Sequence, residues 1–300
     1  MDPAPHSIPQ PGELIGPYRV LGELGRGGMA TVLEVEHADT GARRALKLML
    51  PVARADEVAR RMEREFQTLS RLDHPSVLKV YEAGLYQRRP WFVMEVLEGE
   101  ELGVAVEHWR ALPPAQRFAR AEEVLTRVAE ALACIHDQGL VHRDVTPSNV
   151  MLLRDGGVRL MDFGLAKIQG AEQLTQVGMI AGSPSYIAPE IWKAEEFDHR
   201  VDVYALGAVV FRCLTGQPPF TAPTTLDLFI KATTEERPRL TALRSDLPPE
   251  IDAWIARALA LRRDDRYPYV SSMWNDLISI MMKGSSMSAE KVRATFRLPG

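Results

Sequence analysis

Two carboxylates and one amide stand close together near the middle of the chain. Asp144 and Asn149 lie in the segment VHRDVTPSN, residues 141–149, and Asp162 follows in the motif DFG. Carboxylate and amide oxygens are the ligands that Mg²⁺ prefers, and a further carboxylate can orient a hydroxyl group and accept its proton. These residue types at this spacing predict Mg²⁺-assisted transfer of a phosphoryl group.

The neighbouring elements are expected to hold these residues in place. Apolar residues at 150–152 and 158–161 predict a short hairpin between the two candidate metal ligands. Before the loop, residues 121–138 carry an apolar stripe of helical period, and Gly139 is typical of a helix end. A helix and a hairpin should therefore flank the candidate catalytic loop.

A glycine-rich hairpin is expected near the N-terminus. Strand-like residues 18–21 and 30–35 flank a tip that contains Gly25, Gly27 and Gly28. Without side chains, the backbone N–H groups of such a tip can approach phosphates closely. A tip of this kind is also often only a flexible turn, and the motif alone does not choose between the two interpretations.

One cation, Lys47, lies within the apolar run RALKLML at residues 44–50. It is either a solvated lysine at a sheet edge or a phosphate-binding residue that needs a carboxylate to hold it. Between residues 56 and 72 the apolar residues follow a helical period, and Glu65 lies on their stripe whereas Glu63 does not. Because a buried carboxylate is costly unless it is paired, we expect Glu65 to pair with Lys47.

Taken in order, these motifs resemble those of protein kinases. The catalytic segment is similar to H-R-D-x-x-x-x-N followed by D-F-G, and the glycine-rich tip is similar to G-x-G-x-x-G-x-V, with Ala30 at the third glycine. The matches span roughly residues 18 to 282 in the order of the family. On these motifs the chain is identified as a member of the bacterial eukaryotic-like (Hanks-type) serine/threonine protein kinases.

The resemblance implies an α+β, bilobal protein-kinase-like fold. We expect an N-lobe at residues 17–97, made of a small antiparallel sheet and one main helix, and a larger, mainly helical C-lobe at residues 98–284. Residues 1–16 are expected to form a flexible arm and residues 285–300 a tail or linker.

The resemblance also implies roles for single residues. Asp144 would accept the proton of the substrate hydroxyl, and Asn149 and Asp162 would bind Mg²⁺, with Mn²⁺ as an alternative ion. Lys47, held by Glu65, would contact the phosphates of ATP. The expected ATP-binding residues are Gly25, Gly27, Gly28, Val32, Ala45, Lys47, Met94, Glu95, Leu97 and Met151.

Residues 162–190 are similar to a kinase activation segment. Thr175 is the expected site of autophosphorylation, and Arg143 could bind the phosphate of such a residue through two hydrogen bonds. Ser183 keeps a hydroxyl that could hydrogen-bond Asp144, although a simple turn residue is the alternative interpretation.

Two structural supports are expected from the same resemblance. Residues 202–207, DVYALG, are similar to a buried kinase helix with the pattern D-x-[WY]-x-x-G. Glu190, at the end of the activation segment, is expected to pair with Arg266.

Thr146 departs from the family pattern, because serine/threonine kinases carry a lysine there that steadies the γ-phosphate. No basic residue from 145 to 151 replaces that charge. By analogy with removal of one preorganised donor, the loss in rate would be roughly 10²–10³. Two functions therefore stay open: a kinase acting on Ser and Thr hydroxyls of proteins, which we favour, and an ATP-binding pseudokinase that serves as a docking or regulatory scaffold.

The composition limits the expected partners. With 300 residues, of which 46% are hydrophobic, the chain can bury a large core. A net charge of −4 gives no signal for nucleic acid or for an anionic membrane. The two cysteines fit a reducing compartment, and neither a signal peptide nor a membrane-spanning run is recognisable, so a cytoplasmic location is expected. A protein substrate is the expected partner, and the resemblance also allows a homodimer through the N-lobe.

Overall fold

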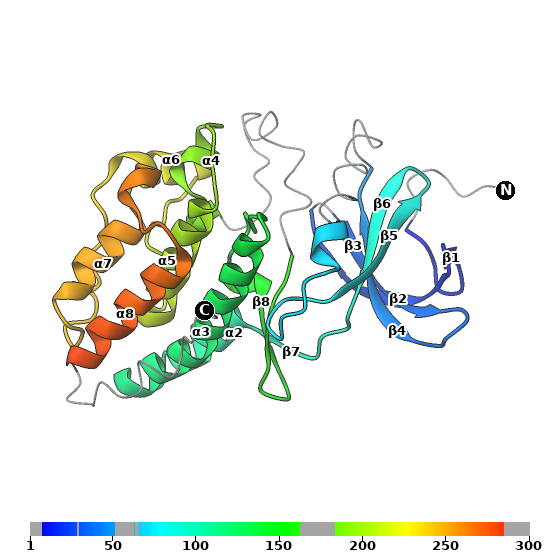
Figure 1. The fold of residues 1–300 in the computed structure, drawn as a ribbon, viewed down its shortest axis with the longest axis horizontal. Coiled ribbons are helices and arrows are strands. Elements are labelled where there is room, and N and C mark those ends of the chain that lie inside the picture. Colours follow the sequence, from blue (N-terminus) through cyan, green and yellow to red (C-terminus); the bar gives the residue numbers. More distant parts are fainter. Residues whose placement is uncertain (1–7, 29, 52–62, 64–65, 163–183, 285–300) are drawn as a thin grey trace.

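The computed structural model describes residues 8–28, 30–51, 63, 66–162 and 184–284. Within these ranges a lobe built on a sheet lies beside a lobe built of helices (Figure 1), which confirms the expected α+β, bilobal architecture. No helix in these ranges is long and apolar enough to cross a membrane.

The N-lobe contains a six-stranded sheet in which every neighbouring pair is antiparallel. The strand order is β1-β2-β3-β4-β6-β5. The strands are β1 (Leu14–Ile15), β2 (Tyr18–Arg26), β3 (Ala30–His37), β4 (Arg43–Met49), β5 (Val80–Tyr86) and β6 (Arg89–Met94). The predicted glycine-rich hairpin is thus confirmed as the connection of β2 to β3.

The two faces of this sheet enter different cores, because side chains alternate along a strand. Leu46 and Leu48 of β4 belong to a small core within the N-lobe. Ala45 and Met49 belong to the main core, which continues into the C-lobe. Lys47 shares the alternating face of Ala45 and Met49, so the strand directs its side chain toward the C-lobe.

Residues between the lobes form a second, three-stranded sheet. Its strands are β7 (Gly99–Glu101), β8 (Val150–Leu153) and β9 (Val158–Leu160), and β8 with β9 is the predicted hairpin after the candidate catalytic loop. The apolar residues of the segment VLKVY, residues 77–81, also predict a strand from Val77, but β5 starts only at Val80. Val77 forms a parallel bridge to Leu160, so the residues before β5 are tied to β9.

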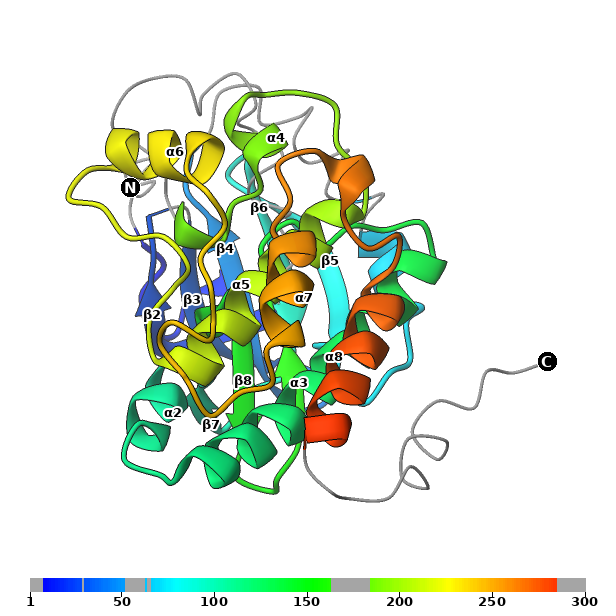
Figure 2. The ribbon, with the colours of Figure 1, turned by 90° about the vertical axis from the view of Figure 1, so that its left-hand side faces the viewer.

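The C-lobe is organised around one helix that is buried on all sides. Helix α5 is buried along nearly its whole length, as expected for the helix containing residues 202–207. Figure 2 shows it among the other helices of the C-lobe. Helices α3, α7 and α8 contact it. The helices are α2 (Leu102–Trp109), α3 (Pro114–Asp137), α4 (Pro189–Trp192), α5 (Arg200–Thr215), α6 (Thr225–Thr234), α7 (Glu250–Ala258) and α8 (Val270–Gly284).

Helix α3 differs from its prediction at one end. It starts at Pro114 instead of residue 121, because proline is well suited to the first turn of a helix and the polar residues after it continue the turn. The predicted apolar stripe is buried as expected, and the helix ends just before Gly139. Of the helix expected between residues 56 and 72, most lies outside the described residues.

Gly99 marks the point where β7 approaches β8 most closely. A Cβ atom at this residue would lie 2.0 Å from the carbonyl oxygen of Leu152. We expect Gly99→Ala to destabilise the protein by about 1–3 kcal/mol, because one of the two strands must move. Urea-induced unfolding checks this, with Gly22→Ala as the control, since a Cβ at Gly22 meets no atom within 4 Å. Equal unfolding midpoints for the two variants would contradict the prediction.

Candidate active site

An ion pair joins the N-lobe to the candidate metal-binding residue of the C-lobe. The Nζ atom of Lys47 lies 2.5 Å from Oδ1 of Asp162. The Lys47 side chain is 14% exposed, so its charge is largely removed from water and depends on this partner. The partner predicted for Lys47, Glu65, lies outside the described residues. The sequence did not reveal the contact with Asp162, because the two residues are far apart in the chain.

The candidate catalytic loop rests on a buried carboxylate. Asp202, in α5, is fully buried, and its two oxygens accept the backbone N–H groups of His142 and Arg143 at 2.8 Å each. Its Oδ2 also lies 2.8 Å from Nε2 of His136. Burial by itself would raise the pKa of this carboxyl, but the hydrogen bond from His136 and the nearby imidazoles bring the pKa below its usual value. Asp202 is therefore an anion in the core that fixes two successive residues of the loop.

Arg143 shows how strongly this loop is constrained. Its backbone has a φ of +67°, a conformation that residues with a side chain seldom adopt. The hydrogen bond to Asp202 stabilises this conformation. The loop thus turns sharply just before Asp144.

The ring of His142 acts as a structural link in the same loop. Its Nε2 donates a hydrogen bond to the carbonyl oxygen of Met161 at 2.9 Å, and its Nδ1 accepts the N–H of Asp144 at 3.3 Å. Complete burial lowers the pKa of the imidazole, which keeps the ring neutral with one donor and one acceptor. His142 therefore connects the backbone of Asp144 to the residue before Asp162.

Asn149 connects the catalytic loop at Asp144 with Met161, the residue before Asp162. The side-chain Nδ2 of Asn149 donates to the backbone carbonyl oxygen of Asp144 at 2.8 Å. The backbone carbonyl oxygen of Asn149 accepts the N–H of Met161 at 2.7 Å. Because Nδ2 is bonded to Asp144, the orientation of the Asn149 side chain is fixed, and its Oδ1 is the atom that would bind a metal ion. One amide oxygen and the carboxylate of Asp162 fit Mg²⁺, which is usually bound by few protein oxygens together with water and phosphates.

Thr146 occupies the place expected for a lysine, and its side chain is buried. Its hydroxyl lies 2.9 Å from the hydroxyl of Ser148. It is 3% exposed, so the structure leaves little room for a long charged chain there without rearrangement. The hydroxyl pair is a local contact within the loop and does not supply a positive charge.

The strand register places three of the expected adenine-binding residues on one face of the N-lobe sheet. Val32 lies opposite Lys47 across the β3–β4 ladder, and Ala45 lies opposite Met94 across the β4–β6 ladder. Met151, in β8, pairs with Glu101 of β7. The sheet thereby groups the aliphatic side chains Val32, Ala45 and Met94 on the same face as Lys47.

The N–H and the carboxylate of Glu95 both form hydrogen bonds within the protein, which the sequence does not indicate. Its N–H donates to the carbonyl oxygen of Lys79 at 3.0 Å, and its carboxylate accepts the N–H of Lys79 at 2.9 Å and the Nε of Arg159 at 3.0 Å. A contact from Glu95 to adenine would therefore use its carbonyl oxygen. The N–H donor for adenine would have to come from Leu97.

The glycine-rich tip keeps its backbone open. Gly25 pairs with Val32, and Gly27 donates its N–H to the carbonyl oxygen of Ala30 at 2.9 Å. A Cβ at Gly25 would meet no atom within 4 Å, and one at Gly27 would meet only Ala30 at 3.9 Å. Packing among the described residues does not explain these glycines. The open backbone is what the predicted phosphate-binding role of the tip requires.

Comparison with known proteins agrees with this geometry. The family model for the protein kinase domain matches residues 18–289 of the chain. The chain belongs to the protein kinase family. The kinase domain of PknI from Mycobacterium tuberculosis has a TM-score of 0.71 and 30% identity, covering 91% of this chain and 99% of that one.

Two curated relatives of the kinase domain come from mycobacteria. The serine/threonine-protein kinase PknH of Mycobacterium bovis is 37% identical over 257 residues, which are 85% of this chain and 42% of PknH. The serine/threonine-protein kinase PknD of Mycobacterium tuberculosis is 35% identical over 265 residues, which are 87% of this chain and 39% of PknD. The kinase domain thus spans about two fifths of the length of these relatives. The predicted membership of the bacterial Hanks-type serine/threonine kinases is confirmed.

The end of the kinase activation segment is anchored as predicted. Glu190 and Arg266 form two parallel contacts of 2.6 Å between guanidinium and carboxylate, and both side chains are almost completely buried. The predicted regulatory residues Thr175 and Ser183 lie outside the described residues. Arg143, expected to bind a phosphate, has its guanidinium 5.5 Å from the ring centre of Phe197.

The kinase domain also contains positioning residues that the sequence did not single out. Asp202 accepts hydrogen bonds from the loop backbone, and His136 contacts Asp202. No sequence motif marks His136. Asp202 could be recognised from its helix motif, but its contacts to the loop could not. These contacts connect elements that are more than fifty residues apart, so only the fold reveals them.

Proposed function

We propose that this kinase domain transfers the γ-phosphate of ATP to Ser or Thr hydroxyls of proteins, with Mg²⁺ as the metal. The observation that carries the proposal is the convergence of Asp144, Asn149 and Asp162 around one hydrogen-bonded loop, with Lys47 contacting Asp162. The relatives PknH and PknD are named serine/threonine-protein kinases, which supports a protein hydroxyl as acceptor.

Each residue has one task in the proposed reaction. The carboxylate of Asp144 orients the substrate hydroxyl and accepts its proton, while the hydroxyl oxygen bonds to the γ-phosphorus and the bond to the β–γ bridging oxygen breaks. Lys47 holds the α- and β-phosphates. Asn149 and Asp162 would hold Mg²⁺, which would supply positive charge to the phosphate oxygens when bound. The glycine-rich tip covers the phosphates, and ADP leaves with the bridging oxygen.

The pseudokinase is the second candidate, and Thr146 is the observation that favours it. Its buried hydroxyl contacts Ser148 and brings no positive charge to the loop. The first function is preferred because Lys47, Asp144, Asn149 and Asp162 are all present and arranged in one site. Autophosphorylation at Thr175, a homodimer and a cytoplasmic location stay predictions.

The test is transfer of labelled γ-phosphate from ATP to the protein itself and to a generic protein substrate. We expect label on Ser or Thr in the presence of Mg²⁺, none after chelation with EDTA, and labelling that is at least about 10²-fold slower with Asp144→Asn. Mapping the labelled residue tests Thr175. ATP binding without any transfer, in Mg²⁺ and in Mn²⁺, would favour the pseudokinase.

A further inference from the structure

Two hydroxyl groups contact each other inside the catalytic loop, next to the candidate metal ligand Asn149. The Oγ1 atom of Thr146 lies 2.9 Å from the Oγ atom of Ser148. Pro147 lies between them, and Pro147–Asn149 is a single turn of 3₁₀ helix. Because proline fixes its own backbone angle φ, the turn is stiff at the point between the two hydroxyls. The hydroxyl bond therefore closes the turn that ends at Asn149.

Thr146 is also joined to this turn by its backbone. Its carbonyl oxygen accepts the N–H of Asn149 at 3.0 Å. A threonine that precedes a helix usually turns its hydroxyl to a backbone N–H of the first turn, but the hydroxyl of Thr146 makes no such bond. It is directed to Ser148 instead. Thr146 thus contacts Asn149 and the residue before it, one through the backbone and the other through the side chain.

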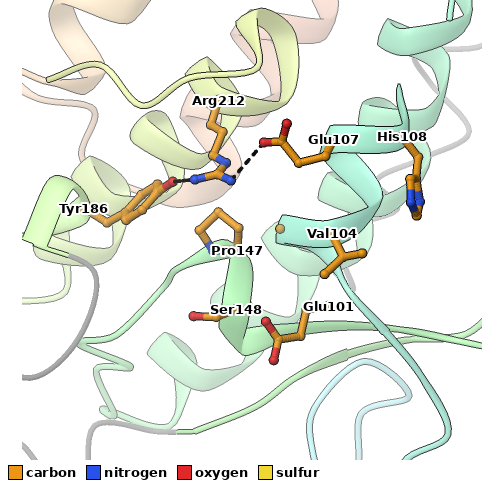
Figure 3. A pocket seen from close by; sticks show the side chains of 9 residues that line it. Glu101, Val104, Glu107, His108, Pro147, Ser148, Tyr186 and Arg212 are labelled. Carbon is orange, nitrogen blue, oxygen red and sulfur yellow. Dashed lines mark hydrogen bonds and ion pairs between the residues drawn. The ribbon is translucent and has the colours of Figure 1, made fainter. Parts of the chain in front are cut away.

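The hydroxyl bond joins a buried residue to an exposed one. Thr146 is 3% exposed, whereas Ser148 lies on the wall of a hollow of about 410 Å³. Figure 3 shows the Ser148 hydroxyl pointing away from the carboxylate of Glu101, so this neighbouring acid does not compete for it. Without the Ser148 hydroxyl, the buried hydroxyl of Thr146 would lose this partner, which costs more than the loss of an exposed hydrogen bond.

Asn149 needs one fixed orientation to present its Oδ1 to a metal ion. Its contacts come from three directions: Nδ2 bonds to Asp144 before the turn, the N–H bonds to Thr146 within it, and the carbonyl oxygen bonds to Met161 after it. Groups that hold a metal ligand without touching the metal set its orientation, and their loss lowers the affinity for the metal. A looser turn would therefore displace Oδ1 of Asn149.

We infer that the hydroxyl bond between Thr146 and Ser148 positions Asn149, so that both hydroxyl residues are positioning residues for the binding of Mg²⁺ together with ATP. The inference rests on the proposed function, which gives Asn149 its role as a metal ligand. It also gives Thr146 a task for which a positive charge is not required. The two hydroxyls act through Asn149 and contact neither the metal nor the phosphates.

Calorimetric titration with ATP, once with Mg²⁺ and once with EDTA, separates the metal-dependent part of the affinity from the rest. Ser148→Ala and Thr146→Val should each weaken binding of ATP with Mg²⁺ by about threefold to tenfold, the net range of one hydrogen bond. Binding of ATP in EDTA should stay unchanged. Thr146→Ser keeps the hydroxyl and should bind like the wild type. The double variant should lose no more than the weaker single variant, because both changes remove the same bond.

Thr233→Val is the matched control, because it makes the same chemical change in α6, where the hydroxyl of Thr233 donates to the carbonyl oxygen of Phe229 at 2.7 Å. It should leave both affinities unchanged. Wild-type binding with Mg²⁺ in both single variants would overturn the inference. So would equal losses with Mg²⁺ and with EDTA, losses that add in the double variant, or a wild type whose affinity for ATP does not depend on Mg²⁺.

Phosphoryl transfer measured over a range of Mg²⁺ concentrations separates this inference from the proposed function. If the wild type transfers phosphate and Ser148→Ala reaches its half-maximal rate at the same Mg²⁺ concentration, the positioning role fails while the kinase function stands. If the wild type binds ATP more tightly with Mg²⁺ but transfers no phosphate, the kinase function fails. The calorimetric comparison of Ser148→Ala with the wild type then still decides on the positioning role.

Discussion

Replacing Asp144 with Asn should lower the rate of phosphoryl transfer by about 10²–10⁴, the usual contribution of a positioned general base. The amide has nearly the same shape as the carboxylate but cannot accept the proton of the substrate hydroxyl. The hydrogen bonds that join Asp144 to His142 and Asn149 are made by its backbone, so the substitution does not remove them. The loss is expected in kcat, with little change in the affinity for ATP.

Single-turnover transfer to a peptide and fluorescence measurement of nucleotide binding check these two expectations separately. Asp137→Asn is the matched control, because Asp137 is an exposed carboxylate at the end of α3 and the substitution makes the same chemical change. Its rate should equal that of the wild type. A variant at Asp144 that retains more than about a tenth of the wild-type rate would contradict the assigned role, because the expected loss is at least about 10²-fold.

Replacing Arg266 with Met should destabilise the kinase domain by about 3–5 kcal/mol, because it leaves the carboxylate of Glu190 buried without its partner. The guanidinium is fully buried and also donates to the carbonyl oxygens of Ala260 at 2.8 Å and Arg200 at 3.1 Å. The substitution therefore breaks contacts between the end of the activation segment, the start of α5 and the loop before α8. Urea-induced unfolding measures the free energy of unfolding.

An exposed ion pair of the same type provides the comparison. Arg154 and Glu98 are 3.2 Å apart, but their side chains are 80% and 73% exposed, so Arg154→Met should cost less than about 1 kcal/mol. Removing both buried charges, in Glu190→Gln with Arg266→Met, should recover part of the lost stability. If Arg266→Met and Arg154→Met have equal costs, burial is not what makes the Glu190 pair important.

Local pattern was enough to predict much of the fold. Alternating residues predicted the hairpin of β2 and β3, and the helical stripe of α3 correctly predicted which of its residues are buried. The pairing of Glu190 with Arg266 also followed from the family resemblance. These features depend on neighbours in the chain or on motifs that are recognisable in one sequence.

Features that depend on distant contacts could not be predicted in the same way. The strand after Val77 starts late because Val77 bridges to Leu160, which is more than eighty residues away. The carboxylate of Glu95 is used by Lys79 and Arg159, so its side chain is not free for a ligand. A hollow beside the loop, lined by Glu101, Pro147 and Arg212, requires helix α5 because Arg212 lies on that helix. These residues can be read from the sequence, but their contacts with one another cannot.

The position of Asp202 has a consequence for motions of the catalytic loop. Local opening of a loop normally costs much less free energy than unfolding of the core, so loops and cores often behave as separate cooperative units. Here two successive amide groups of the loop are bonded to a carboxylate on the most deeply buried helix. Releasing these amides would leave an unsolvated anion in the core. The catalytic loop therefore belongs to the same cooperative unit as α5, and the slowest opening motions of the C-lobe also set how often the loop can open.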